Sequence, residues 1–290
     1  MKKEIKFVVA NICILVKINA HYSFFYENKR YISFLSNSSQ ESDCVIDYIF
    51  TTPEEIDVIL AKCSLIRRQG VAGDYYSYQN GQAFLFDVYY LDNIVGRKLL
   101  LFNQDRKSAT VYIDTQKINE YYYDDLMVIF STLLSQDNGL ILHCTAVKNK
   151  ETNEVKIFSG ESGNGKSTIA KIFQESNRYT ILNDDRIIIR KAGERYLAYG
   201  SPWYSKTQLN ANEWGEVKDI YFIFHGKSNC KQILSVSEAR KMFLKNVFYI
   251  PNWDNKHLFM TLAFAKNLCR NFVSYKLFFV PDDRVINYLE

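Results

Sequence analysis

The sequence predicts an α/β core in the second half of the chain, preceded by a mainly antiparallel β domain. The first half of the 290 residues is a series of short segments rich in Val, Ile, Tyr and Phe, which favour strands. The second half alternates strand-like and helix-like patterns. Between one such strand and the next helix lies a glycine-rich segment with the spacing of a phosphate-binding loop. We therefore expect two domains, residues 1–118 and 119–290.

Short strands separated by turn-forming residues are expected in the first domain. The predicted strands are Ile5–Ile18, Phe24–Leu35, Cys44–Phe50, Tyr75–Tyr78, Gln82–Leu91, Lys98–Phe102 and Ala109–Ile113. One helix is expected from Pro53 to about Cys63, because Glu54 and Glu55 would lie in its first turn. This domain shows no cluster of residues typical of catalysis, so we expect it to recognise a substrate or partner.

The second domain is expected to begin with a helix and then to alternate strands and helices. The first helix is predicted by the apolar spacing of Leu126, Ile129, Phe130, Leu133 and Leu134. The predicted strands are Leu140–Leu142, Val155–Phe158, Tyr179–Leu182, Arg186–Lys191, Ile220–Phe224 and Tyr275–Val280. Further helices are predicted after the glycine-rich segment, after the capping box Ser235–Glu238, at about His257–Arg270 and after Pro281-Asp282-Asp283.

The glycine-rich segment carries the pattern G-x-x-x-x-G-K-[ST]. Its candidate phosphate-binding residues are Gly160, Glu161, Ser162, Gly163, Asn164, Gly165, Lys166, Ser167 and Thr168. The glycines permit positive φ, so that backbone N–H groups can close around phosphate oxygens, and the next helix offers the positive end of its dipole. Lys166 would reach the β- and γ-phosphates of a nucleoside triphosphate, and the Ser167 hydroxyl would bind Mg²⁺.

An acidic pair, Asp184-Asp185, follows the strand after that helix. Ligands of open α/β sheets bind at the carboxyl ends of strands, so the pair and the glycine loop are expected to face one pocket. The two carboxylates could divide two tasks, holding Mg²⁺ and deprotonating an attacking hydroxyl. The pairs at 124–125 and 282–283 are instead expected at helix starts, where Asp interacts favourably with the helix dipole.

Two further features near this region allow two interpretations each. His143 is expected at the end of the strand Leu140–Leu142, either as a core residue or as a member of the site. The turn Gly200–Trp203 is either a plain loop or a flap over the substrate.

Composition excludes several other function classes. The formal net charge of +4 is too small to indicate nucleic-acid binding. No apolar run is long enough to span a membrane, and Met1–Val16 is read as a strand rather than a signal peptide, so a cytoplasmic location is expected. The six cysteines are far apart, and neither they nor the four histidines have the spacing of a disulfide framework or metal site.

Three short segments form one ordered pattern. A predicted strand with a His lies at Leu142–Val147, the glycine loop at Phe158–Thr168, and an Asp-Asp-Arg at the end of the next strand in Leu182–Arg186. In this order they resemble the catalytic domain of the HPr kinase/phosphorylase family, within the phosphoenolpyruvate-carboxykinase-like P-loop kinases. The added turn Gly200–Trp203 is similar to that of HPr-kinase-like proteins found beside peptide-modification genes. The resemblance covers about residues 126–290.

The resemblance implies ATP and Mg²⁺ as ligands and a role for each matching residue. Lys166 would stabilise the transferred phosphoryl group, and Ser167 and Asp185 would hold Mg²⁺. Asp184 would be the general base, with His143 close enough to tune it. The Glu-Ile-Arg-Gly segment of HPr kinases is not present here, so HPr itself is not the expected acceptor. Related kinases form oligomers, which makes a homo-oligomer possible.

The leading hypothesis is an ATP- and Mg²⁺-dependent kinase that transfers the γ-phosphate to a hydroxyl, in particular Ser of a peptide or protein. Two alternatives stay open: a non-catalytic ATP-binding switch or sensor, and a kinase for a small molecule. All of them need the glycine loop, whereas only a kinase needs Asp184 as a base.

Overall fold

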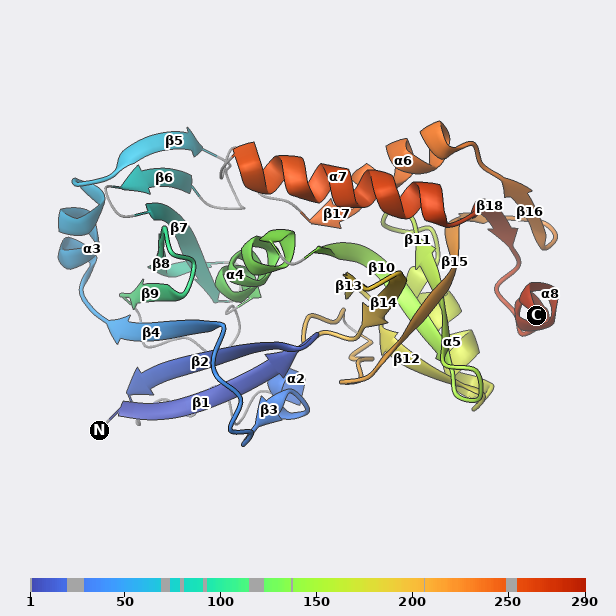
Figure 1. Ribbon diagram of the computed structural model, residues 1–290, viewed down its shortest axis with the longest axis horizontal. Coiled ribbons are helices and arrows are strands. Elements are labelled where there is room, and N and C mark those ends of the chain that lie inside the picture. Colours follow the sequence, from blue (N-terminus) through green and yellow to red (C-terminus); the bar gives the residue numbers. More distant parts are fainter. Residues whose placement is uncertain are drawn as a thin grey trace. The chain divides into compact units, whose positions relative to one another are not determined.

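The computed structural model describes residues 2–19, 29–68, 74–78, 81–90, 93–114, 123–136, 138–205, 207–248 and 255–290. The protein is mixed α/β, with two mixed β-sheets and helices packed on both (Figure 1). The chain divides into two compact units, Met1–Leu133 with Ile250–Asn255, and Leu134–Tyr249 with Lys256–Glu290. The division falls at residue 133, whereas the sequence placed the domain boundary at 118, outside the described residues. Most of helix α4 (Tyr123–Gln136) therefore belongs to the first unit.

The described residues of the first unit form a sheet in the order β3-β1-β2-β4-β9-β8-β7-β6-β5. Its strands are β1 (Lys2–Val9), β2 (Ile12–Asn19), β3 (Leu35–Ser36), β4 (Cys44–Phe50), β5 (Ser64–Arg68), β6 (Asp74–Tyr78), β7 (Gly81–Tyr90), β8 (Asn93–Asn103) and β9 (Ser108–Ile113). Most neighbours are antiparallel, but β4 runs parallel to both β2 and β9, so the sheet is mixed.

The first expected strand, Ile5–Ile18, is wrong, because it is a hairpin of β1 and β2. Ala10 and Asn11 turn the chain with φ of 51° and 61°, a left-handed pair that the apolar run around them conceals. The expected strand Phe24–Leu35 is also wrong where it is described. Its end forms the short helix α2 (Lys29–Ile32) followed by β3.

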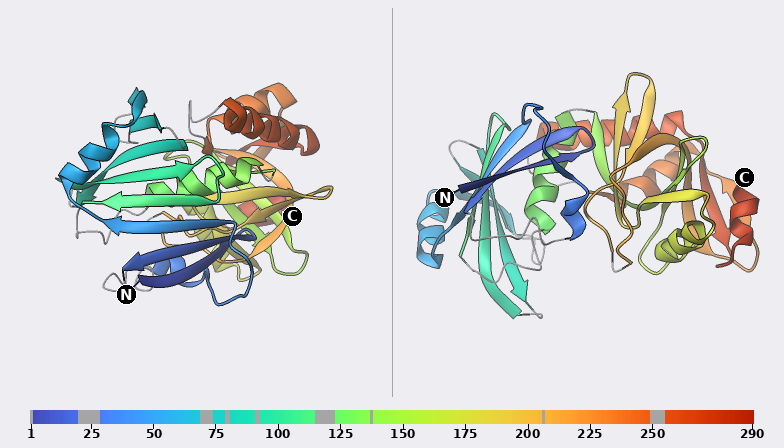
Figure 2. Two further views of the ribbon diagram at one scale, coloured as in Figure 1. Left: turned by 60° about the vertical axis from the view of Figure 1, so that its left-hand side comes forward. Right: turned by 90° about the horizontal axis from the view of Figure 1, so that it is seen from below.

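Two helices cover opposite faces of the first sheet, as the right-hand view of Figure 2 shows. Helix α3 (Pro53–Leu60) starts with a capping box between Thr52 and Glu55, as expected for a helix beginning at Pro53. Its Ile56 packs with Ala83 and Leu99 on one face. Helix α4 lies on the other face, to which alternate strand residues such as Lys98 and Tyr48 point.

A buried ion pair holds α4 to this sheet. The Lys98 ammonium donates to Asp125 Oδ1 at 2.6 Å, and the Tyr48 hydroxyl donates to Asp125 Oδ2 at 2.7 Å. The three side chains are almost completely excluded from solvent. Asp125 lies in the first helical turn as expected. Its carboxylate, however, accepts hydrogen bonds from two strands of the sheet in addition to its interaction with the helix dipole.

The second unit contains a sheet with the main order β11-β10-β13-β14-β15-β18-β16, and β12 and β17 add to β10. Its strands are β10 (Gly139–Asn149), β11 (Glu154–Ser159), β12 (Tyr179–Asn183), β13 (Arg186–Ala192), β14 (Arg195–Tyr199), β15 (Trp214–His225), β16 (Cys230–Ile233), β17 (Val247–Phe248) and β18 (Ser274–Phe279). Strands β11, β15 and β18 are parallel, so their carboxyl ends share one edge of the sheet.

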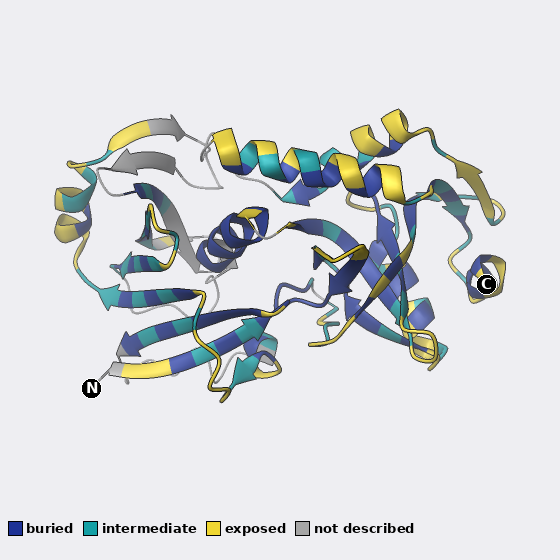
Figure 3. Ribbon diagram, viewed as in Figure 1, coloured by how far each residue is buried: buried dark blue, intermediate teal, exposed yellow. Residues whose placement is uncertain are grey.

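Helices cover both faces of this second sheet. They are α5 (Lys166–Glu175), α6 (Val236–Leu244), α7 (Asn255–Asn271) and α8 (Arg284–Leu289). Apolar residues of α5 and α8 form one cluster with Phe158 and Tyr221, and those of α6 and α7 form another with Ile157 and Phe222. Neighbouring residues of β11 and of β15 thus face opposite layers. Figure 3 shows the central strands as buried, whereas β16 is exposed along its length.

The strands and helices predicted around the glycine-rich segment are confirmed, with small shifts of their ends. The expected position of His143 is wrong, because β10 continues through it to Asn149. Strands β14, β16 and β17 were not predicted. In the described part of the chain, no helix combines the length and the apolar character needed to cross a membrane.

Candidate functional site

The glycine-rich segment forms the connection between β11 and α5. Gly163 and Gly165 have φ of 89° and 95°, which is the left-handed region that favours glycine. Gly165 is the N-cap of α5 and makes no side-chain cap. Glu161, Ser162 and Gly163 are exposed, and a Cβ atom at Gly163 would meet nothing within 4 Å. The loop therefore presents its backbone and a helix N-terminus to the surroundings.

The Lys166 side chain lies beneath this loop rather than in solvent, with a relative exposure of 8%. Its ammonium donates to the carbonyl oxygens of Gly160 at 2.8 Å and Glu161 at 3.1 Å. Burial lowers the pKa of Lys166, and the nearby Asp185 carboxylate partly opposes that shift. Next to Lys166, Ser167 is half-buried and Thr168 is exposed.

The acidic pair stands in a turn shaped by Asn183. This buried residue accepts the N–H groups of Asp185 at 2.7 Å and Arg186 at 2.8 Å on its Oδ1 atom. Its amide nitrogen donates to the Ser201 carbonyl oxygen at 2.9 Å. The sequence reasoning gave Asn183 no role, although an Asn before a turn is a recognised local signal.

Asp184 is buried, with a relative exposure of 1%. Both of its carboxylate oxygens accept hydrogen bonds from Ser205: the backbone N–H at 2.9 Å and the hydroxyl at 2.6 Å. Burial raises the pKa of Asp184, and the two bonds from Ser205 act in the opposite direction. The effect of burial prevails, so the pKa of Asp184 lies above that of an ordinary Asp.

Asp185 is the more accessible member of the pair. Its Oδ1 atom lies 3.0 Å from Nε2 of His143 and 3.2 Å from Nη1 of Arg186. The sequence placed His143 beside Asp184, whereas its side chain contacts Asp185. The Nε atom of Arg186 is buried and has no hydrogen-bond partner among the described residues.

Strand β10 brings the glycine loop and the acidic turn together. On one edge of the strand Cys144 pairs with Ser159, the last residue of β11, while the Cys144 N–H donates to the Asp185 carbonyl oxygen at 3.0 Å. The buried Thr145 hydroxyl lies 3.2 Å from the Lys166 carbonyl oxygen and 3.3 Å from that of Asp184. The start of α5 and the acidic pair are therefore separated by a single side chain.

Two residues that the sequence reasoning missed support the loop. His225, at the carboxyl end of β15, has its Nε2 atom 2.8 Å from the Gly163 carbonyl oxygen. The Phe279 ring, at the end of β18, lies where a Cβ atom on Gly165 would approach to 2.8 Å. The only sequence signal for either residue was its position at the end of a predicted strand.

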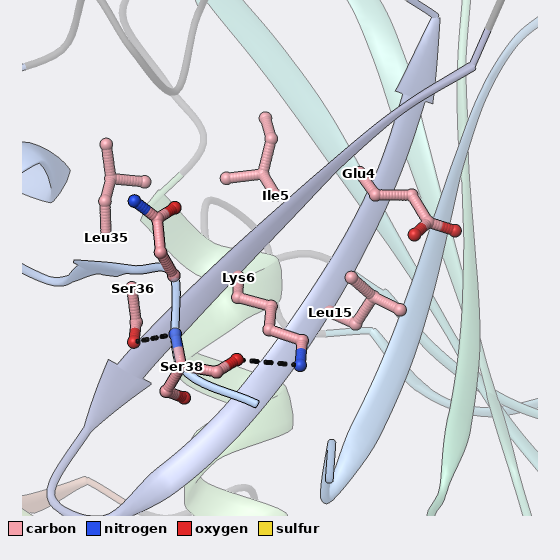
Figure 4. A pocket seen from close by; sticks show the side chains of 8 residues that line it. Glu4, Ile5, Lys6, Leu15, Leu35, Ser36 and Ser38 are labelled. Atoms are coloured by element: carbon pink, nitrogen blue, oxygen red, sulfur yellow. Dashed lines mark hydrogen bonds between the residues drawn. The ribbon is translucent and has the colours of Figure 1, made fainter. Parts of the chain in front are cut away.

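A cavity of about 310 Å³ at the edge of the first sheet is lined by Lys6, Leu15, Ser38 and their neighbours (Figure 4). The Lys6 ammonium donates to the carbonyl oxygens of Ser38 at 3.2 Å and Gln40 at 2.8 Å, so backbone groups already satisfy it. Among the described residues, no group of three or more His, Cys, Asp or Glu side chains could hold a metal ion.

Comparison with known proteins gives no family for this chain. No model of a protein family matches the sequence, and a search of curated proteins finds no match either. The function of this chain is therefore inferred from the residues of the site and from the resemblance of its short segments.

Proposed function

We propose that this chain is an ATP- and Mg²⁺-dependent kinase of the HPr-kinase-like type, with its P-loop core in the second unit. It transfers the γ-phosphate to a hydroxyl, in particular Ser of a peptide or protein. The observation that carries the proposal is the Thr145 hydroxyl, which lies within hydrogen-bond distance of the backbone of both Lys166 and Asp184. The start of the helix after the glycine loop and the backbone of the acidic turn are thereby adjacent.

The residues present fit a triphosphate. The loop has the left-handed glycines and the uncapped helix N-terminus that phosphate oxygens require. A buried ammonium at Lys166 with carbonyl partners can exchange those partners for phosphate oxygens, a stronger charge-assisted interaction. A Cβ atom at Gly163 would meet nothing within 4 Å, so this part of the loop is open.

Each side chain of the site has a distinct task in the proposed reaction. Lys166 neutralises charge on the moving phosphoryl group, and Asp184 accepts the proton of the acceptor hydroxyl. The raised pKa of Asp184 suits a base that must bind a proton during transfer. Ser167 and Asp185 would hold Mg²⁺, which supplies charge neutralisation for the phosphates when it is bound.

The His143 and Arg186 side chains orient the metal-binding carboxylate. Both contact Asp185 Oδ1, so they restrict the rotation of that carboxylate. The first unit, with no clustered catalytic side chains among its described residues, is proposed to recognise the acceptor.

The variants Lys166→Ala and Asp184→Asn test the proposal, because nucleotide binding and phosphoryl transfer can be measured separately in each. Titration calorimetry with Mg²⁺ and a non-hydrolysable ATP analogue should show binding to the wild type and to Asp184→Asn. Transfer of labelled γ-phosphate to an array of Ser-containing peptides should fall by about 10²-fold or more in both variants, since each removes an interaction of the transition state. Lys171→Ala is the matched control, because Lys171 is exposed on the same helix.

The results also distinguish the alternative functions. Binding without transfer to any peptide or small alcohol would favour a nucleotide-dependent switch. Transfer to small alcohols alone would favour a small-molecule kinase. Absence of nucleotide binding by the wild type would overturn the proposal.

A further inference from the structure

The Ser205 hydroxyl lies at hydrogen-bond distance from the carboxylate of Asp184. Its hydroxyl donates to Asp184 Oδ2 at 2.6 Å, and its backbone N–H donates to Oδ1 at 2.9 Å. A general base must lie about 2.6–3.2 Å from the hydroxyl whose proton it removes. The chain thus places one of its own serines at the carboxylate to which the proposed function assigns that role.

Ser205 is the more accessible partner in its contact with Asp184. The residue is half-buried, unlike the fully buried Asp184. Its hydroxyl oxygen accepts the Thr207 N–H at 3.3 Å and lies 3.3 Å from the Thr207 hydroxyl oxygen, and both are weaker contacts than the bond to Asp184. The turn that carries it is held to the acidic turn, because the Asn183 amide donates to the Ser201 carbonyl oxygen. The contact between Asn183 and Ser201 therefore helps to hold Ser205 next to Asp184, in addition to the two hydrogen bonds that Ser205 itself makes.

We propose that Ser205 is an internal phosphoryl acceptor, which the chain modifies in the absence of its external substrate. This inference rests on the proposed kinase function. In the step, the Ser205 oxygen forms a bond to the γ-phosphorus of ATP while its proton moves to the Asp184 carboxylate. The bond between the γ-phosphorus and the bridging oxygen breaks, and its electron pair leaves with ADP.

The product cannot keep the present contact. Phosphoserine carries about −1.5 to −2 charges at neutral pH, and the ionised Asp184 carboxylate beside it is also negatively charged. Repulsion should separate residue 205 from Asp184 and expose the base to an external acceptor. Self-modification would thus be a regulatory event that opens the site.

The direct test is incubation of the wild-type chain with Mg²⁺ and γ-labelled ATP, followed by peptide mapping. We expect label on Ser205, and we expect it to be lost in Ser205→Ala, Lys166→Ala and Asp184→Asn. Ser237→Ala is the control, since it removes an exposed serine hydroxyl on α6 of the same unit and should keep the label on Ser205. Ser205→Thr keeps a hydroxyl and should carry label as phosphothreonine, which covers the case that Ser205→Ala does not fold.

A mixing experiment tests whether the transfer is internal. Tagged Lys166→Ala chains are incubated with untagged wild type, and we expect label on the wild-type chains alone. Label on the Lys166→Ala chains, label at another residue, or no label on a wild type that phosphorylates peptides would overturn the inference and leave the kinase function standing. Failure of the wild type to bind nucleotide would overturn both.

Discussion

At the scale of single residues, Gly165 is the most constrained position of the glycine loop. It has φ of 95°, and the Phe279 ring occupies the space that a Cβ atom would need. Gly163 has a similar φ of 89° but open space around it. Gly163 is therefore required for its backbone conformation alone, whereas Gly165 is required for its backbone conformation and for the absence of a side chain next to Phe279.

We predict that Gly165→Ala is clearly more destabilising than Gly163→Ala. In both variants the alanine must adopt a left-handed conformation, which costs about 1–3 kcal/mol for a residue other than glycine. Only Gly165→Ala adds a steric conflict with the Phe279 ring, which should shift the loop and weaken nucleotide binding. Urea denaturation and calorimetric titration measure the two effects. Equal losses in the two variants would contradict the packing argument.

Asp184 provides a second prediction at this scale. Its pKa is raised by burial, and the hydroxyl of Ser205 lowers it again in part. Ser205→Ala removes that hydroxyl, so the pKa of Asp184 should rise further. A base must be ionised to act, and the acidic limb of the pH–rate profile of peptide phosphorylation should therefore move to higher pH in this variant.

Carboxyl NMR titration of Asp184 checks the direction of this shift independently of activity. In Ser237→Ala, which removes an exposed hydroxyl on α6, the titration should match the wild type. A lower pKa in Ser205→Ala would show that the hydroxyl does not stabilise the carboxylate.

At the scale of elements, helix α4 depends on a buried ion pair for its position on the first sheet. The Lys98 ammonium and the Tyr48 hydroxyl both donate to Asp125. Removing one partner of such a pair leaves a buried charge without compensation. The exposed pair of Asp282 and Arg284, also at a helix start, offers the contrast.

We predict that Asp125→Ala costs about 3–5 kcal/mol of unfolding free energy, because the Lys98 charge loses its partner. Tyr48→Phe should cost about 1.5–3 kcal/mol, the usual range for a hydrogen bond to a charged group. Asp282→Ala is the control and should change stability little, since solvent screens its partner. Chemical denaturation followed by circular dichroism measures all three. A near-neutral Asp125→Ala would contradict the role given to this pair.

The elements that sequence reasoning found and missed differ in how local their signals are. Helix α6 was predicted because Ser235 and Glu238 form a capping box within four residues. The hairpin of β1 and β2 was missed because Ala10-Asn11 lacks the glycine that usually marks such a turn. Strand β16 was missed because all its side chains are exposed, so that it shows no apolar alternation.

At the scale of the whole molecule, the chain consists of two compact units, each with its own sheet and apolar clusters. The proposed nucleotide site lies entirely in the second unit. A ligand that binds only the folded form of one unit stabilises that unit by mass action.

We predict that scanning calorimetry shows two unfolding transitions and that Mg²⁺ with an ATP analogue raises only one of them. At a ligand concentration of one hundred times Kd the stabilisation should be about 2.7 kcal/mol. Asp125→Ala should lower the other transition, which assigns it to the first unit. A single transition that moves as a whole with ligand would mean that the units unfold together.

Local chemistry in the sequence determined the strand, loop and helix around Gly160–Thr168, together with the residue types of the candidate site. Glycines with positive φ and a lysine at a helix start require only neighbours in the chain to be recognised. The tertiary structure decided which groups meet: His143 with Asp185, Ser205 with Asp184, and His225 with Gly163. These contacts join segments far apart in the chain, and their selection depends on strand pairing and burial, which no local pattern encodes.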